Sequence, residues 1–223
     1  MKKSVLIAKD LHKTFYTPEP LPILKGISIE VEEGETIAIM GKSGEGKSTL
    51  LHVLGTLEAP TQGKIQIKGK DVDHVRTAAL RNEHIGFIFQ NFNLLEDYSV
   101  LENVLMPAKI GRRSTKRADP SYQKGLELIE RVGLSSRLHF PIKLLSGGEK
   151  QRAAIARSLC NDPDLILADE PSGNLDRATS AHIHSLLIES AKQFSKSLIV
   201  VTHDQELAAL CDRILILKDG HLH

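Results

Sequence analysis

The stretch from Gly41 to Thr49 constrains the fold of this chain more than any other feature. It consists of a glycine, four further residues and then Gly-Lys-Ser, which is the phosphate-loop pattern. The apolar residues 36–40 before it have the length of a strand, and residues 49–54 after it are typical of a helix start. A strand, a glycine-rich turn and a helix N-terminus aim backbone N–H groups and the positive end of the helix dipole at one point. That point suits a polyphosphate.

Single side chains in this stretch have separate chemical roles. Lys47 adds a cation for the β- and γ-phosphates, and the Ser48 hydroxyl can ligate Mg²⁺. Glu45 is unusual, because a carboxylate near phosphates repels them unless it points outward, toward a partner subunit or a cation. We expect Glu45 to modulate affinity without abolishing binding. The alternative is a glycine-rich turn that happens to contain a lysine. The residues expected to contact nucleotide here are Gly41, Lys42, Ser43, Gly44, Glu45, Gly46, Lys47, Ser48 and Thr49.

Bulk composition excludes several classes of protein. The chain has 223 residues, enough for one large domain or a core with a small subdomain. Lys plus Arg is 29 against 28 for Asp plus Glu, so the basic footprint of a nucleic-acid-binding protein is absent. The sequence has neither a signal-peptide pattern nor an apolar run of transmembrane length. Cys160 and Cys211 form no C-x-x-C pair, and we expect buried, reduced thiols. We therefore expect a cytoplasmic chain whose membrane part, if any, is another chain.

The hydrophobic pattern predicts an antiparallel sheet beside a parallel one. Residues 4–31 alternate apolar and polar positions and are interrupted by the proline-rich stretch 17–22, which indicates two antiparallel strands. Residues 63–68 return to that sheet and end at a turn over 69–71. Further strands are predicted at 36–40, 85–89, 164–168, 197–201 and 212–217, alternating with helices over 149–159 and 177–192 and from 204. Such alternation around a phosphate loop is typical of a parallel α/β core.

A helical block interrupts this core. Residues 98–144 have helical spacing of apolar positions, broken by a basic, polar loop at 111–117 that we interpret as a solvated connection. The predicted fold is α/β, a P-loop NTPase core with an antiparallel β subdomain and an inserted helical subdomain. We divide the single domain into a nucleotide-binding core, residues 1–90 and 160–223, and a helical subdomain, residues 91–159.

Two adjacent carboxylates, Asp169 and Glu170, follow the apolar strand near residue 165. Side chains at the C-terminal end of such a strand face the crevice beside the phosphate loop. Phosphoryl transfer needs one group to hold Mg²⁺ and another to orient or deprotonate the attacking water. We assign Asp169 to Mg²⁺ and Glu170 to the general base. The alternative is a pair of strand-end acids that cap the next turn.

Several short motifs then resemble those of the ATP-binding-cassette (ABC) ATPases, whose core is RecA-like. Residues 145–149, Leu-Ser-Gly-Gly-Glu, resemble the family's signature motif, which lies between a glutamine loop and the Asp-Glu strand. Gln90 resembles the glutamine-loop residue, residues 172–176 resemble the D-loop, and His203 resembles the switch histidine. Each motif alone is weak, and His203 alone could be an ordinary strand-end histidine. Their fixed order across nearly the whole chain is specific.

The resemblance implies a dimer that binds ATP between its subunits. In this family each ATP lies between the phosphate loop of one subunit and the signature motif of the other. A second anion-binding helix N-terminus is predicted after Ser146, Gly147 and Gly148. If this N-terminus and the one after the phosphate loop belong to separate subdomains, one chain can hardly present both to a single phosphate, whereas two copies can. An aromatic ring stacks on adenine in this family; Phe15 occupies that position, with Tyr16 as the alternative.

The resemblance also assigns the family's roles to single residues of this sequence. The resemblance implies catalytic roles for Glu170, His203, Lys47 and Gln90. It implies Mg²⁺ ligands at Ser48, Gln90 and Asp169. It implies that a partner subunit's ATP is contacted by Ser146, Gly147, Gly148, Glu149 and Asp176.

Longer stretches resemble the LolD-type ATPases of lipoprotein-releasing transporters and their MacB-like relatives. They are residues 47–52, 80–82 with 85–90, 101–104 with 106–107, and 167–171 with 173–176. This resemblance implies a homodimer in the ATP state, with LolC/LolE-like integral membrane permease subunits as partners, at the cytoplasmic face of the inner membrane and without nucleic acid. A groove at Phe92, Leu94, Leu95 and Tyr98 would receive a permease helix, unless these are core residues of the helical block. A MacB-like exporter, an FtsE-like cell-division ATPase and a non-transport ATP switch remain alternatives, because all share the ATP site.

Overall fold

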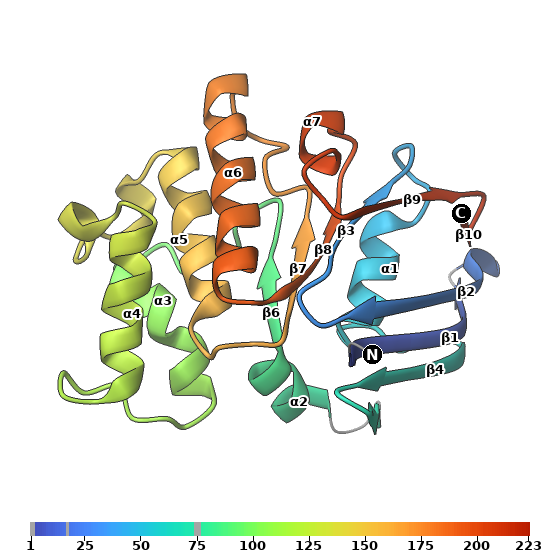
Figure 1. The fold of residues 1–223 in the computed structure, drawn as a ribbon, viewed down its shortest axis with the longest axis horizontal. Coiled ribbons are helices and arrows are strands. Elements are labelled where there is room, and N and C mark those ends of the chain that lie inside the picture. Colours follow the sequence, from blue (N-terminus) through green and yellow to red (C-terminus); the bar gives the residue numbers. More distant parts are fainter. Residues whose placement is uncertain (1–2, 17, 74–76) are drawn as a thin grey trace.

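A computed structural model of the chain describes residues 3–16, 18–73 and 77–223 (Figure 1). Four strands form an antiparallel sheet in the order β2-β1-β4-β5: β1 (Ser4–Phe15), β2 (Leu21–Glu32), β4 (Gln62–Ile67) and β5 (Lys70–Asp71). The alternation in the sequence predicted β1, β2 and β4. The turn predicted at 69–71 instead includes β5, because Lys70 pairs back with Ile67. Thr17, in the predicted proline-rich loop, lies outside the described residues.

The second sheet is parallel apart from its last strand. Its order is β10-β9-β3-β8-β7-β6, with β3 (Thr36–Met40), β6 (Ile85–Ile88), β7 (Leu165–Asp169), β8 (Ser197–Val201), β9 (Arg213–Lys218) and the antiparallel β10 (His221–Leu222). The central strands are continuous apolar runs because both of their faces are buried. Since β8 lies between β3 and β7, the segments that follow these three strands meet at one edge of the sheet.

Seven helices of the described chain cover these sheets. They are α1 (Lys47–Leu54), α2 (Thr77–His84), α3 (Val100–Ile110), α4 (Pro120–Arg131), α5 (Gly147–Leu159), α6 (Arg177–Gln193) and α7 (Gln205–Ala208), with short 3₁₀ turns at Ser135–Arg137 and Ile142–Leu144. The predicted helices over 149–159 and 177–192 are confirmed, and the first begins two residues earlier, at Gly147. The sequence analysis missed α2, which has no buried residue and therefore no apolar stripe that a pattern search could find.

Two apolar cores hold the elements together. One fills the space between the sheets around α1, and it combines Leu50 and Leu54 with β-strand residues such as Leu6 and Ile39. The other joins α3, α4, α5 and α6 to the opposite face of the parallel sheet. In Figure 1 the antiparallel strands lie at one end of the molecule and α3, α4 and α5 at the other. The parallel sheet lies between them and therefore fixes the antiparallel strands relative to α3, α4 and α5.

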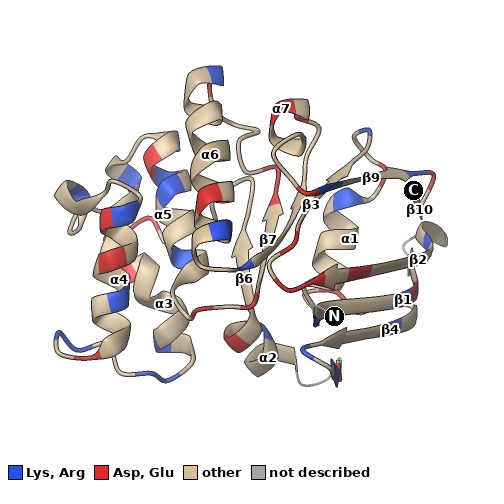
Figure 2. Cartoon of the chain, in the orientation of Figure 1, with Lys and Arg blue, Asp and Glu red and all other residues tan. Residues whose placement is uncertain are grey.

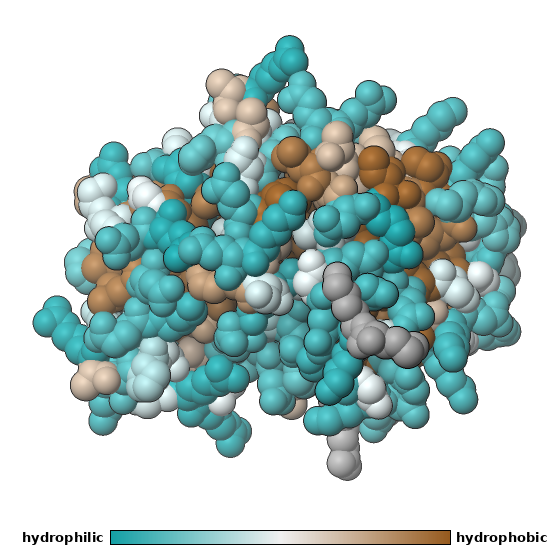
Figure 3. Space-filling view, in the orientation of Figure 1, coloured by the Kyte–Doolittle hydropathy of each residue, from teal (hydrophilic) through white to brown (hydrophobic). Residues whose placement is uncertain are grey.

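The surface carries mixed charge. Lys and Arg alternate with Asp and Glu over the helices and strands (Figure 2), and hydrophilic side chains cover most of the face shown in Figure 3. The thiol of Cys160 is buried, that of Cys211 is half-buried, and burial raises the pKa of each to about 11. No helix in the described part of the chain combines the length and apolarity needed to cross a bilayer.

Candidate functional site

The phosphate loop joins β3 to α1, and two glycines shape it. Gly44 and Gly46 have φ angles of 86° and 94°, a left-handed conformation that glycine adopts without strain. Gly46 also passes close to β2, because a Cβ atom there would lie 2.5 Å from Cγ2 of Ile23. Helix α1 begins directly afterwards at Lys47. The N–H groups of its first turn lack intrahelical partners and therefore favour an anion in the loop.

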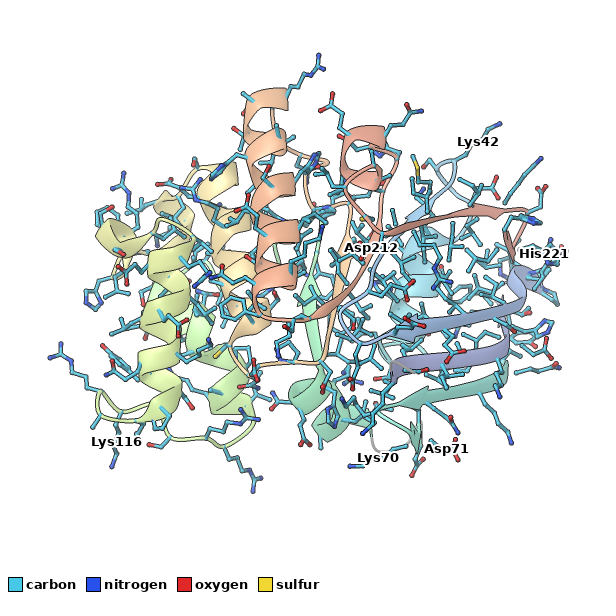
Figure 4. All side chains as sticks on the ribbon, in the orientation of Figure 1. Lys42, Lys70, Asp71, Lys116, Asp212 and His221 are labelled. Atoms are coloured by element: carbon cyan, nitrogen blue, oxygen red, sulfur yellow. The ribbon has the colours of Figure 1, made fainter. Side chains whose placement is uncertain are left out.

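The side chain of Lys47 folds back over this loop. Its Nζ donates to the carbonyl oxygens of Gly41 at 2.9 Å and Lys42 at 3.0 Å. The residue is only 9% exposed, whereas the side chain of Lys42 extends into solvent (Figure 4). An ammonium group has three donors, so a phosphate oxygen in the loop can accept from the third. Lys47 thus holds the loop in shape and supplies its positive charge.

The residues Ser48 and Asp169 bring two oxygen ligands together. The Ser48 hydroxyl donates to Oδ1 of Asp169 at 3.0 Å, across the gap between α1 and β7. Burial raises the pKa of Asp169, an effect that the Ser48 hydrogen bond partly opposes. Magnesium prefers hard oxygen ligands and usually takes one or two carboxylates, substrate phosphates and several waters. This hydroxyl–carboxylate pair fits Mg²⁺, whose charge would offset the burial of Asp169. No cluster of three His, Cys, Asp or Glu ligands occurs among the described residues.

Glu170 is held at both carboxylate oxygens by the end of β8. Its Oε1 lies 2.9 Å from Nδ1 of His203, and its Oε2 accepts from the Thr202 hydroxyl at 3.2 Å. Its backbone N–H donates to the carbonyl oxygen of Val201 at 2.9 Å. Glu170 also has a φ angle of 41°, which is uncommon for a residue with a side chain and typical of strained functional positions. The surrounding contacts therefore impose the orientation of this carboxylate.

A cleft of about 660 Å³ connects these groups. Phe15 lies at one side of it, and Gln90, Glu170 and His203 also line it. The Nζ of Lys13 lies 4.9 Å from the centroid of the Phe15 ring. Tyr16, the alternative for stacking on adenine, is not among the lining residues. The remaining lining residues are Ile23, Gly41, Lys42, Ser43, Gly44, Gly46, Lys47, Ser48 and Thr49.

The carboxylate of Glu45 turns away from this cleft. Its Oε2 accepts the backbone N–H of Asp219, in the turn between β9 and β10, at 2.7 Å. The outward direction agrees with the sequence-based expectation, but the group it meets is a backbone N–H of the same chain. Because the charge of Glu45 is directed away from the loop and hydrogen-bonded, it repels a bound phosphate less than a carboxylate inside the loop would.

The signature stretch forms a well-capped helix start at α5. The Ser146 hydroxyl accepts the N–H of Glu149, and the Glu149 carboxylate accepts the N–H of Ser146 at 2.9 Å, which is a capping box. This hydrogen bond from Ser146, together with Arg137, holds the pKa of Glu149 below its usual range. The carboxylate of Glu149 thus serves its own helix, and Gly148 allows the close approach of Thr179, whose Cγ2 would lie 2.6 Å from a Cβ atom at that position.

A separate cleft lies in front of α5. Ser146, Gly147, Gly148 and Glu149 line it together with Asp176, whose carboxylate caps α6 by accepting the Thr179 N–H at 3.0 Å. This cleft shares no lining residue with the cleft at the phosphate loop. A single chain therefore brings the phosphate loop, Asp169, Glu170, His203 and Gln90 together, and leaves the predicted signature residues and Asp176 elsewhere.

Sequence reasoning missed several residues at this site. Thr202 is fully buried and bonds Glu170, and Ile23 lines the cleft beside Gly46. The half-buried Arg157 donates to the carbonyl oxygen of Phe92 at 2.8 Å and also to that of Asn93, so α5 holds the segment after Gln90. Only Thr202 had a sequence signal, a hydroxyl residue between an apolar strand and His203. The others depend on contacts between distant segments.

Comparison with known proteins agrees with this geometry. The family described as "ABC transporter" matches residues 24–173. A lipoprotein-releasing system ATP-binding protein, LolD, of Protochlamydia amoebophila (strain UWE25) is 52% identical over 219 residues, which cover 98% of this chain and 96% of that protein. The LolD of Cytophaga hutchinsonii is 44% identical and covers 98% of both chains. The ATP-binding cassette MJ0796, solved as a dimer in a post-hydrolysis state with ADP and Pi, superposes with a TM-score of 0.88 at 36% identity, covering 98% of this chain and 96% of its own.

The family match, the near full-length similarity and the arrangement of the loop, the acidic strand end and the signature helix all agree. The chain belongs to the ABC transporter family, as an ATP-binding subunit of the ATPase type homologous to LolD.

Proposed function

We propose that two copies of this chain close head to tail on ATP and drive membrane subunits that release lipoproteins from the inner membrane. One observation carries the dimer: the phosphate loop and the helix start at Ser146 line separate clefts in one chain. A second copy can place its Ser146 N-terminus opposite the first copy's phosphate loop. The choice of lipoprotein cargo is supported by the 52% identity to a LolD protein over nearly the whole length of both chains.

The residues of one chain bind and orient ATP before the second closes over it. Phe15 stacks on adenine at the outer side of the cleft, since base stacking accepts any aromatic ring. The N–H groups at the start of α1 and the Nζ of Lys47 hold the β- and γ-phosphates. Ser48 and Asp169 would hold Mg²⁺, with Gln90 at the edge of the same cleft. When bound, that ion neutralises charge on the phosphate oxygens.

Glu170 then acts on the attacking water. Thr202 and His203 orient its carboxylate in the open cleft, and Thr202 keeps it aligned as it accepts the proton of the water that meets the γ-phosphate. In this role the His203 ring leaves Oε1 of Glu170 for the phosphate, where it stabilises the developing charge. The closing subunit adds the helix N-terminus at Ser146 and excludes bulk water. Each interaction is worth more in the dry, closed site than in the open cleft.

A groove on another face supports the coupling to membrane subunits. It measures about 350 Å³ and lies between α2, β6, α3 and α5. Its apolar lining includes Phe87, Phe89, Met106, Pro107 and Ile110. These residues differ from the groove residues that the sequence indicated. Leu94 packs partly buried on the core, while Leu95 and Tyr98 are exposed outside this groove.

We propose that a cytoplasmic helix of a LolC/LolE-like permease fills this groove. Gln90 lies two residues after β6, next to the groove residue Phe89, so a movement of Gln90 on ATP binding would displace a helix in the groove. The chain would thereby be held peripherally at the cytoplasmic face of the inner membrane. Hydrolysis at Glu170 would reopen the dimer and reset the permease.

The test uses the full chain with Glu170→Gln, which should bind ATP and trap the closed dimer. Tagged protein loaded with ATP and Mg²⁺ is used to capture partners from detergent-solubilised membranes of the source cells, followed by mass spectrometry. Recovery of permease chains with large periplasmic domains, together with bound lipoprotein, supports the proposal. Recovery of a drug- or peptide-exporting permease, of a cell-division membrane protein, or of soluble proteins alone overturns the lipoprotein assignment.

A matched control addresses the groove. Adding Met106→Glu to the Glu170→Gln chain places a charge in the groove and leaves the ATP cleft unchanged. This double variant should form the ATP-bound dimer as readily as Glu170→Gln, by size-exclusion chromatography, yet capture no permease. Equal permease recovery by both variants would rule out the groove as the docking site.

A further inference from the structure

His184 is a buried polar residue on α6 to which the steps above give no task. It is only 2% exposed, and the buried face of its helix is otherwise mostly apolar, with Ile183, Leu187 and Ile188. Burial lowers the pKa of His184, against the opposing charges of Asp204 and Glu206. Burying an imidazole costs free energy unless its nitrogens find partners. The partners it does have lie at the catalytic segments.

The imidazole connects two loops that flank the general base. Its Nε2 lies 2.7 Å from the Ser172 hydroxyl oxygen, in a buried hydrogen bond. The same nitrogen is 3.9 Å from Oδ2 of Asp204. Ser172 comes two residues after Glu170, and Asp204 comes directly after His203. His184 therefore lies behind both catalytic segments, with its ring between them.

Further hydrogen bonds connect these two segments to Glu170 itself. The Thr202 hydroxyl donates to Oε2 of Glu170 at 3.2 Å and accepts the N–H of Asp204 at 3.0 Å. On the other side, the N–H of Gly173 donates to the carbonyl oxygen of Glu170 at 3.0 Å, next to Ser172. The path from Glu170 through Thr202, Asp204, His184 and Ser172 thus returns to the backbone beside Glu170, with hydrogen bonds at each step except the 3.9 Å approach of His184 to Asp204.

We propose that His184 is a positioning residue for ATP hydrolysis, which fixes the Ser172 and Asp204 segments so that the Glu170 carboxylate and the His203 ring keep their alignment. This inference rests on the proposed role of Glu170 as the base. His184 does not line the nucleotide cleft, so its contribution is confined to the alignment of groups that act in the transition state. Such a residue affects kcat and leaves nucleotide binding unchanged.

The first variant is His184→Leu in the full chain, since leucine is of similar size and cannot bond Ser172. We expect kcat to fall about 5- to 10-fold, the effect of one hydrogen bond felt in the transition state, with KM for ATP within about twofold of wild type. His184→Gln, whose amide can still reach the Ser172 hydroxyl, should recover most of the lost rate. If His184 only stabilised the fold, His184→Leu would have a lower melting temperature, and His184→Gln would not recover the lost kcat.

Ser172→Ala gives an independent measurement if His184→Leu folds poorly. Its loss of kcat should match that of His184→Leu, and the double variant should lose no more than either single variant, because both remove the same bond. Unchanged kcat in His184→Leu or in Ser172→Ala, or losses that multiply in the double variant, would overturn the inference.

Glu170→Gln measured in the same assay separates the two proposals. If Glu170→Gln is inactive and His184→Leu is as fast as wild type, only the role of His184 is wrong. If Glu170→Gln hydrolyses ATP at the wild-type rate, the base assignment is wrong, and the role of His184 is wrong with it.

Discussion

Replacing Thr202 with valine tests how the structure orients the general base. Valine has nearly the shape of threonine but lacks the hydroxyl, which donates to Oε2 of Glu170 at 3.2 Å and accepts the N–H of Asp204 at 3.0 Å. Thr202 is fully buried, so water cannot easily replace these bonds. The Glu170 carboxylate would keep the His203 contact at Oε1 and would lose its second constraint.

The expected magnitude follows from the bond that is lost. A hydrogen bond to a charged group contributes about 1.5–3 kcal/mol, and about 1.4 kcal/mol corresponds to tenfold in rate. If the whole of this free energy is lost from the transition state, kcat should fall by about 10- to 150-fold. The 3.2 Å separation is long for a hydroxyl donor, so we expect a loss near the lower limit. The unpaired N–H of Asp204 should also lower the free energy of unfolding, by about 1 kcal/mol or more.

The assay is the initial rate of ATP hydrolysis by the full chain over a range of ATP concentrations, well below the melting temperature. Thr202→Val should lower kcat and leave KM within about twofold, because Thr202 does not line the cleft. Thr202→Ser, which keeps the hydroxyl, is the matched control and should retain most of the activity. If Thr202→Val has wild-type kcat, or if Thr202→Ser loses as much as Thr202→Val, this account of the site is refuted.

Three further predictions concern single side chains at the site. Glu45→Ala should lower the free energy of unfolding by about 1 kcal/mol in thermal denaturation, because the N–H of Asp219 loses its acceptor. Glu45→Gln should lose far less, and equal losses in the two variants would contradict a stabilising role for this hydrogen bond. Phe15→Ala should raise KM for ATP about 5- to 150-fold, the range for losing one base-stacking ring, with Phe15→Tyr near wild type. Burial raises the pKa of Asp169, so in the nucleotide-free chain this carboxyl should contribute a loss of stability as the pH rises from its ordinary pKa of 3.8 to the raised value; pH-dependent melting curves of Asp169→Asn should lack that contribution.

Much of the fold could be predicted because its signals are local. The strand before Gly41 and the helix after Gly46 follow from apolar spacing and from glycines that adopt left-handed conformations. The capping pair Ser146 and Glu149 marks the start of α5 in the same way, since its members are three residues apart. Where the apolar pattern is missing, as in α2, sequence reasoning also fails.

By itself the sequence determined the order of the motifs, the chemistry each side chain can perform and the α/β class of the fold, because these depend on residue types and short spacings. Only the tertiary structure decided which groups meet. The order of β3, β8 and β7 brings Thr202 to Glu170, and the turn after β9 brings Asp219 to Glu45. Packing of α6 against the loop ends places His184 beside Ser172. Such contacts join residues far apart in the chain, and their geometry depends on how whole sheets and helices bury their apolar faces.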